Sequence, residues 1–263
     1  TRVIPLCYAI AIAGVVQFVA PIVICYLLGS DSVARTVGSL VKAEAFDGID
    51  PKAVFIFLLS AMIAALGWSV ICVLLSVPNS TSHTLLGGIV GAAIAMFGFG
   101  LVDWTMVGLR VILMVFLTPV ICIAVGFLLS KLFRVICARM DRSVKKAFRA
   151  MQVVNVVLLS TSISINNVQK AMGIYLLALV VCGGADGATY RFEFWTVGVL
   201  SLAIMLGLFL GGYKLIYTVG KRIYRLGTLQ SYVAQLSTAV VAFTCTFTGI
   251  PVSTGQVVSS SII

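Results

Sequence analysis

The sequence predicts an all-α polytopic membrane protein, and three observations support this: the composition, the long apolar runs and the placement of the charges. Of the 263 residues, 61% are hydrophobic and only 10% are charged, so the chain cannot cover a globular surface with polar groups. Backbone polar groups must pair internally in lipid, and the sequence has no alternating barrel-type strands, so helices are expected.

The apolar runs give the predicted membrane helices. A helix that crosses the hydrocarbon core needs about 20 apolar residues. Seven runs approach or exceed this length: residues 3–28, 53–77, 84–100, 106–130, 150–182, 195–217 and 229–248. The seven cysteines lie mostly within these runs, at spacings that fit neither a metal site nor a redox pair, and we expect them to serve in packing.

The charges predict which side of the membrane each loop faces. Residues 131–149 carry seven basic side chains and residues 221–225 form a second basic cluster, so both are expected in the cytoplasm. The loop between the crossings 150–182 and 195–217 then faces outward, as does the net acidic loop 39–52. Since the net charge of +10 is explained by this topology, no nucleic-acid partner is expected.

The chain contains two short internal matches that occur in the same order. "LLGSDSVARTVG" (27–38) matches "FLGGYKLIYTVG" (209–220), and "VPNSTSH" (77–83) matches "IPVSTGQ" (250–256). The first copy leads into a loop predicted to be external and its counterpart leads into a cytoplasmic cluster. The two copies are therefore predicted to be inverted with respect to the membrane.

Inverted repeats are typical of secondary transporters, whose sites lie near the bilayer midplane beside interrupted helices. We therefore predict an inverted-repeat secondary transporter with re-entrant or broken helices, working by alternating access. The first repeat would cover residues 1–130, a basic cytoplasmic linker 131–149, and the second repeat 150–263.

The matching Ser-Thr turns are the first candidate site. In each turn a proline is followed by hydroxyl residues and then by a run that can be helical, a pattern that indicates a helix start inside the membrane. A helix N-terminus offers N–H groups and a partial positive charge, so two such ends could hold one tetrahedral anion. The alternative is that Ser and Thr only cap these helices.

The stretch "TSISINNVQKAMGI" (161–174) is the second candidate site, because it places amides and a lysine in an apolar run. Amide groups offer donors and acceptors, which suits an anion together with a small cation. The alternative for the asparagines is hydrogen bonding between helices. Lys170 either attracts an anion or extends to the membrane surface.

The single histidine, His83, lies at the first Ser-Thr turn, where it serves either in proton coupling or phosphate contact or in packing at the helix start. The sequence has no nucleophile and base pair, phosphate-cradling Gly loop or paired carboxylates. An enzyme is therefore not predicted.

Three of these segments carry a family resemblance. "INNVQKAMGI", "GGYKLIYTVGKRI" and "GIPVSTGQVVSSSI" follow one another as in the second half of the inorganic phosphate transporter family, of the phosphate permease type. "VPNSTSHTLLGGIVGAAIA" resembles the corresponding part of the first half, and "TRVIPLCYAIAIAG" resembles the sequence just after the first family signature. The resemblance implies a cation-coupled phosphate carrier, with phosphate held at the signature segments and Ser-Thr turns, and a homodimer.

The chain departs from the family pattern at both predicted sites. Where the family usually has His, Gly, Ala, Asn and Asp, residues 163–167 read Ile, Ser, Ile, Asn and Asn, so the carboxylate is replaced by Asn167. The usual Ser-Thr-Thr-His turn reads Ser, Thr, Gly and Gln at 253–256. Comparison of the repeats also leads us to expect one helix before Thr1 and two after Ile263.

We therefore predict phosphate transport in a bacterial-type plasma membrane or an organelle membrane. The predicted substrate-binding residues are Ser80, Thr81, Ser82, Asn166, Asn167, Gln169, Ser253 and Thr254. No resident cofactor is expected. The residues predicted to couple transport to an ion are His83, Asn166 and Asn167, and the alternatives are coupling to sodium, coupling to a proton and no coupling. The alternatives are a permease for sulfate or another oxyanion, and a transport-inactive structural subunit.

Overall fold

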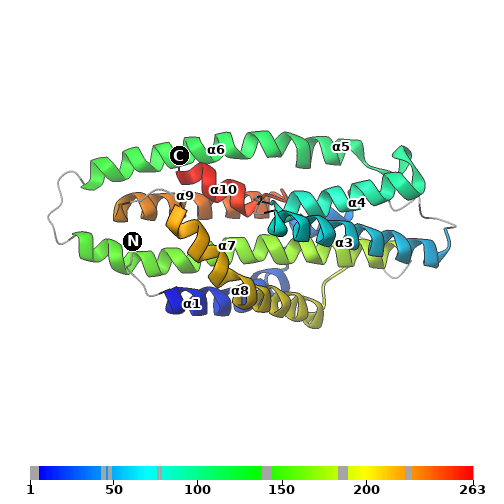
Figure 1. Cartoon of the computed structure of the whole chain (residues 1–263), viewed down its shortest axis with the longest axis horizontal. Helices are drawn as coiled ribbons and strands as arrows, with labels where there is room; N and C mark the ends of the chain where they lie inside the picture. Colours follow the sequence, from blue (N-terminus) through cyan, green and yellow to red (C-terminus); the bar gives the residue numbers. More distant parts are fainter. Residues whose placement is uncertain are drawn as a thin grey trace.

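The computed structural model describes residues 6–42, 46, 49–75, 77, 79–137, 144–182, 189–222 and 227–262. Its elements follow in the order α1 (Leu6–Pro21), η1 (Ile22–Leu27), α2 (Ser32–Gly38), α3 (Pro51–Leu74), α4 (Thr81–Phe97), η3 (Phe99–Leu101), α5 (Trp104–Met106), η4 (Val107–Ile112), α6 (Leu113–Cys137), α7 (Val144–Val181), α8 (Phe194–Arg222), α9 (Thr228–Phe247) and α10 (Thr254–Ile262). They form an elongated helical bundle (Figure 1). Within the described residues, extended pairing is limited to one bridge between Val41 and Val102.

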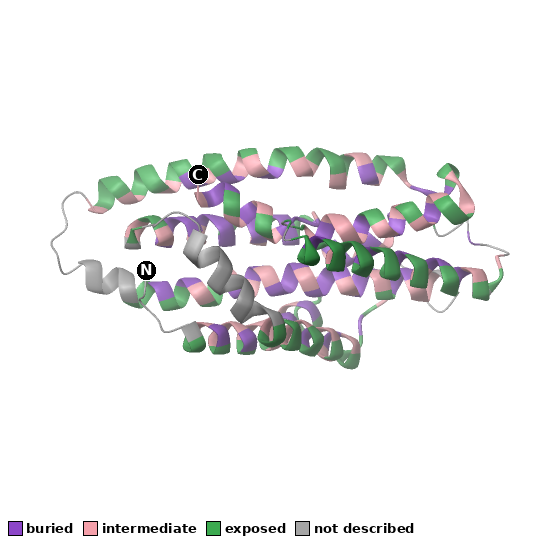
Figure 2. Ribbon diagram, viewed as in Figure 1, coloured by how far each residue is buried: buried purple, intermediate pink, exposed green. Residues whose placement is uncertain are grey.

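The helices have the length and composition of membrane helices, which confirms the predicted fold class. Four stretches are long and apolar enough to cross a bilayer: Cys7–Leu27, Lys52–Leu74, Trp104–Cys137 and Ala150–Val180. Two shorter apolar helices, Thr81–Phe97 and Phe194–Leu210, accompany them. Exposed residues follow the outer faces of α3 and α6 (Figure 2), and many are large apolar side chains such as Phe55 and Phe116, as a lipid-facing surface requires.

Two helical hairpins enter the bundle from opposite ends of its long axis. The α3–α4 hairpin enters from the right in Figure 1 and turns midway along the molecule, whereas α9–α10 enters from the left and also turns midway. Helices α3 and α4 approach so closely at Gly88 that a Cβ there would lie 2.7 Å from the carbonyl oxygen of Ala61. The full crossing expected for residues 84–100 is not observed, because α4 begins at Thr81 in the middle of the bundle.

Helix α7 lies in the centre of the bundle and contains the polar stretch 161–174. It packs against α1, α2, α8 and α9. Ile165, Val168 and Met172 are fully buried in a cluster that includes Ala34 of α2. Polar residues of α7 are thus held at fixed positions by the apolar residues between them.

The helical conformation is interrupted before α2. Gly29 has a φ of +66°, a conformation that favours glycine, and separates η1 from α2. Residues 209–220, matched to this region in the sequence, lie within the continuous helix α8, so these two segments differ in local structure. By contrast, segments 77–83 and 250–256 both lead into a helix start, at α4 and α10.

Which end of the bundle faces the cytoplasm stays a prediction from the charges. Lys42 N–H donates to Leu101 O (2.9 Å) at one end, and α6 passes to α7 at the opposite end (Figure 1). Residues 138–143 and 223–226, which hold part of the predicted basic clusters, lie outside the described residues. The division into two inverted repeats, with its boundaries, stays a prediction.

Candidate functional site

The two predicted turns each start a helix in the middle of the bundle. The Ser80 hydroxyl oxygen accepts a hydrogen bond from His83 N–H (3.3 Å) at the start of α4. The Ser253 hydroxyl oxygen accepts one from Gln256 N–H (3.4 Å) at the start of α10. The capping interpretation therefore holds for both serines. Each capping hydroxyl keeps its own proton and can still donate it to a ligand.

The turns also touch each other. Ser82, in the first turn of α4, is buried, and its hydroxyl donates to the carbonyl oxygen of Val252 (2.9 Å) just before α10. The N-terminal N–H groups of a helix have no partner within the helix. Two sets of such donors therefore lie on either side of one small region, which we call the turn junction: residues 80–83 and 252–254.

Lys170 of α7 reaches into the turn junction. Its side chain is 4% exposed, and Nζ donates to Ser82 Oγ (2.6 Å), to the Val252 carbonyl oxygen (2.8 Å) and to Asn167 Oδ1 (3.2 Å). Of the two readings left open by the sequence, extension to the membrane surface is excluded, because the ammonium points into the bundle.

The three oxygens around the Lys170 ammonium are all neutral. None of the helices within the described residues contains an aspartate or a glutamate. The eight acids of the sequence are Asp31, Glu44, Asp47, Asp50, Asp103, Asp141, Asp186 and Glu193. Within the described residues, the ion pair formed is that of Arg35 with Asp31. A buried charge is costly unless it is paired, so Lys170 in its charged form calls for an anion.

Asn166 adds an acceptor near the same face of α7. It is fully buried, and its Nδ2 donates to Thr246 Oγ1 (3.0 Å). The Thr246 hydroxyl itself donates to Ala242 O (2.8 Å), which fixes it as the acceptor and fixes the orientation of the amide. Asn166 Oδ1 is left without a hydrogen-bond partner among the described residues. Such an atom can receive a proton donor or a cation from a ligand.

Gln169 is not brought to the turn junction. Its Oε1 accepts from Val33 N–H (2.9 Å), and its Nε2 donates to Ser30 O (2.8 Å) and Ser30 Oγ (3.3 Å). Successive residues of a helix point roughly 100° apart, so Gln169 and Lys170 face different neighbours. Gln169 therefore fixes the start of α2 against α7, and no contact of its amide reaches the turns.

Thr81, Thr254 and His83 lie at the turns, and no hydrogen bond to another described residue fixes their side chains. Thr81 is exposed, and Thr254 and His83 are half-buried in the first turns of α10 and α4. Their position is therefore as predicted, and their roles as ligands stay predictions. Pro78, part of the matched motif, lies outside the described residues.

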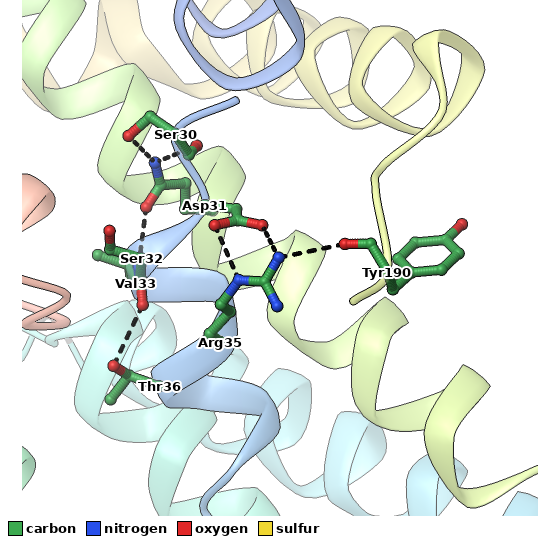
Figure 3. Close-up of polar contacts among 8 residues, drawn as sticks. Ser30, Asp31, Ser32, Val33, Arg35, Thr36 and Tyr190 are labelled. Atoms are coloured by element: carbon green, nitrogen blue, oxygen red, sulfur yellow. Dashed lines mark hydrogen bonds and ion pairs between the residues drawn. The ribbon is translucent and has the colours of Figure 1, made fainter. Parts of the chain in front are cut away.

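A second charged group lies beside α7 and was missed from the sequence. Arg35 donates through Nε to Asp31 Oδ1 (3.0 Å) and through Nη2 to Asp31 Oδ2 (2.6 Å), and Nη2 also donates to the Tyr190 carbonyl oxygen (3.2 Å). Figure 3 shows this ion pair between the start of α2 and the segment that enters α8. The charge of Arg35 is thus neutralised within the protein, unlike that of Lys170.

A sequence signal for this region does exist. "SDSVARTVG" (30–38) matches "INNVQKAMG" (165–173) at an offset of 135 residues, by chemical type more than by identity. The corresponding pairs are Asp31 with Asn166, Ser32 with Asn167, Val33 with Val168, Arg35 with Lys170, and Gly38 with Gly173. Residues 30–38 are thus a candidate for the first-half counterpart of residues 165–173.

The two matched segments cross at their glycines. A Cβ on Gly173 would lie 2.5 Å from Val37 Cβ and 2.7 Å from Ala34 O, a distance at which something must shift. The hydrogen bond from Val33 N–H to Gln169 joins the same segments one turn away. The matching stretches therefore pack against each other in the centre of the bundle.

Comparisons with known proteins agree with this arrangement. The sequence matches the phosphate transporter family over residues 1–263. It is 32% identical over 260 residues to a probable low-affinity inorganic phosphate transporter of Bacillus subtilis (strain 168), covering 97% of this chain and 74% of the relative. It is 30% identical over 268 residues to a protein of the same name from Rhizobium meliloti (strain 1021), covering 100% and 75%.

A solved structure has the same fold. The sodium-dependent phosphate transporter superimposes with a TM-score of 0.71 at 19% sequence identity, over 97% of this chain and 88% of that one. The relatives are named as transporters, so the expectation of a non-enzymatic integral membrane protein is confirmed. The sequence match, the shared fold and the Ser-Thr turns lead to one conclusion: this chain belongs to the phosphate transporter family.

Proposed function

We propose that the protein carries inorganic phosphate across a membrane and binds it at the turn junction. The observation that carries this proposal is the buried Lys170 ammonium, which lies between two helix N-termini and is surrounded by neutral oxygens. Phosphate supplies the missing negative charge. The names of the relatives support phosphate as the substrate.

The donors around the junction suit a tetrahedral anion. Lys170 supplies the positive charge, and one of its three N–H donors turns to the anion from the Asn167 oxygen, the longest of its three contacts at 3.2 Å. The hydroxyls of Ser80 and Ser253 supply neutral donors, whereas that of Ser82 is already donated to Val252 O. The first turns of α4 and α10 add backbone N–H groups and the positive ends of their dipoles. Charge-assisted hydrogen bonds are stronger than neutral ones, so Lys170 is the dominant ligand.

Asn166 favours phosphate over sulfate. Asn166 and Lys170 are four residues apart on α7, so their side chains lie on one face, with Cβ atoms about 5–6 Å apart. The unpartnered Oδ1 of Asn166 can accept the proton of a hydrogen phosphate, whereas sulfate has no proton to donate. A buried acceptor left unpaired penalises the wrong anion.

The hairpins support transport by alternating access. The α3–α4 and α9–α10 hairpins enter from opposite ends and meet at the junction (Figure 1). Withdrawal of one turn would open the junction to one end, and withdrawal of the other turn to the opposite end. The coupling ion is a separate question: sodium appears in the name of the structural relative. The predicted homodimer stays a prediction.

Uptake of radiolabelled phosphate into proteoliposomes tests this function. We expect uptake that saturates with phosphate and that excess unlabelled sulfate inhibits at least tenfold less effectively than excess unlabelled phosphate. Equal inhibition by sulfate would replace phosphate with a general oxyanion. Folded full-length protein that takes up neither anion would overturn the transporter proposal in favour of a structural subunit.

A further inference from the structure

We infer that the Lys170 ammonium is a built-in counter-cation, which fills the oxygen cage that a coupling ion would otherwise occupy at the turn junction. Phosphate binding and uptake at this site then need no sodium. The inference rests on the proposed function and adds the source of the positive charge that accompanies the anion.

The cage consists of the oxygen types that bind alkali cations in carriers. Backbone carbonyls at interrupted helices coordinate sodium in such proteins. Here a backbone carbonyl (Val252), a hydroxyl (Ser82) and an amide oxygen (Asn167) lie 2.8, 2.6 and 3.2 Å from Lys170 Nζ. All three are directed at the ammonium, which takes the place of a free ion.

The absence of a carboxylate at position 167 agrees with the replacement of a free cation by the Lys170 ammonium. A free cation in a buried site needs a negative protein group near it, and the family resemblance leads us to expect an aspartate at position 167. This chain has Asn167 there, and the Asn167 amide oxygen accepts from Lys170 three residues later. Because no described carboxylate contacts the cage, a second cation would face the ammonium without compensation.

The position of Lys170 explains how a tethered cation serves this purpose. The ammonium contacts Ser82 of one hairpin and Val252 of the other, so it lies where both turns close around the anion. A coupling ion must be bound anew in each cycle, whereas Lys170 is always present. The other charged group in this region, Arg35, is held by Asp31 and Tyr190 and does not compete for the anion.

The test compares phosphate uptake in sodium chloride and in choline chloride at equal pH and ionic strength, with the full-length protein in proteoliposomes. We expect wild-type rates that agree within twofold. K170N removes the ammonium, and we expect at least a tenfold loss in both salts. The matched control is Lys52→Asn, which changes an exposed lysine at the start of α3 and is expected to keep wild-type uptake.

A second variant keeps the inference testable if K170N is poorly active. N167D/K170N supplies a carboxylate and vacates the cage, so sodium should raise its thermal unfolding midpoint and leave that of the wild type unchanged. Wild-type uptake that rises tenfold or more with sodium overturns this inference but not the proposed function. The same holds if the sodium ion binds at Asn166 and not in the cage. No wild-type uptake in either salt overturns the proposed function instead.

Discussion

Replacement of Lys170 by methionine is the perturbation that the site geometry makes most informative. Methionine keeps an unbranched side chain of similar length and removes the ammonium, so the apolar neighbours on α7 stay packed. A hydrogen bond to a charged group contributes about 1.5–3 kcal/mol, and about 1.4 kcal/mol corresponds to a tenfold change in affinity. We therefore expect the Kd for phosphate to rise about 10-fold to 150-fold.

The folded state should tolerate this change. Lys170 loses three hydrogen bonds, but a buried charge is also removed, and these effects oppose each other. The hydrogen bond from Ser82 Oγ to Val252 O (2.9 Å) still joins the two turns. The expected change in stability is therefore within about 1 kcal/mol. A purely structural lysine would instead give a large loss of stability.

Equilibrium binding of radiolabelled phosphate to the purified protein in detergent measures the effect, and thermal unfolding of the same samples measures stability. Lys52→Met is the control, because it removes an exposed lysine far from the turns and should leave the Kd unchanged. Folded Lys170→Met protein that binds phosphate within twofold of the wild type would show that Lys170 is not a phosphate ligand.

Three further substitutions test separate contacts. Asn166→Leu removes the unpartnered acceptor, so inhibition of radiolabelled phosphate uptake by unlabelled phosphate should weaken about 5-fold to 10-fold, while inhibition by sulfate stays the same. An equal loss for both anions would mean that Asn166 does not distinguish phosphate from sulfate. Gln169→Leu leaves Val33 N–H unsatisfied, and thermal unfolding should show a loss of about 1–3 kcal/mol with an unchanged Kd for phosphate; a raised Kd in folded protein would assign Gln169 to the site. Gly173→Ala places a Cβ 2.5 Å from Val37 Cβ and should cost about 1–3 kcal/mol in the same assay; unchanged stability would mean that α2 and α7 are not packed closely there.

Much of the fold could be predicted from the sequence because its signals are local. The apolar runs define the membrane helices, and Ser80 and Ser253 mark helix starts because capping depends on neighbouring residues. Hydropathy could not show that α4 begins midway, since a short apolar run is compatible with either a crossing or a re-entrant helix. That distinction depends on packing between α3 and α4.

The site was predictable only in part. The sequence places Ser82, Asn167 and Lys170 in polar interruptions, but whether Lys170 points inward depends on contacts between residues about 80 positions apart. Gln169 belongs to the same polar stretch and faces α2 instead. The alignment of Asp31 with Asn166 is not seen when only identical residues are compared, because these side chains are similar in shape and polarity but not identical.

An experimental structure of the full-length protein with bound phosphate would show directly whether the anion lies at the turn junction. We expect a tetrahedral anion between the turns of α4 and α10, with one oxygen about 3 Å from Lys170 Nζ. Phosphate bound elsewhere, with Lys170 still surrounded only by neutral oxygens, would contradict this expectation.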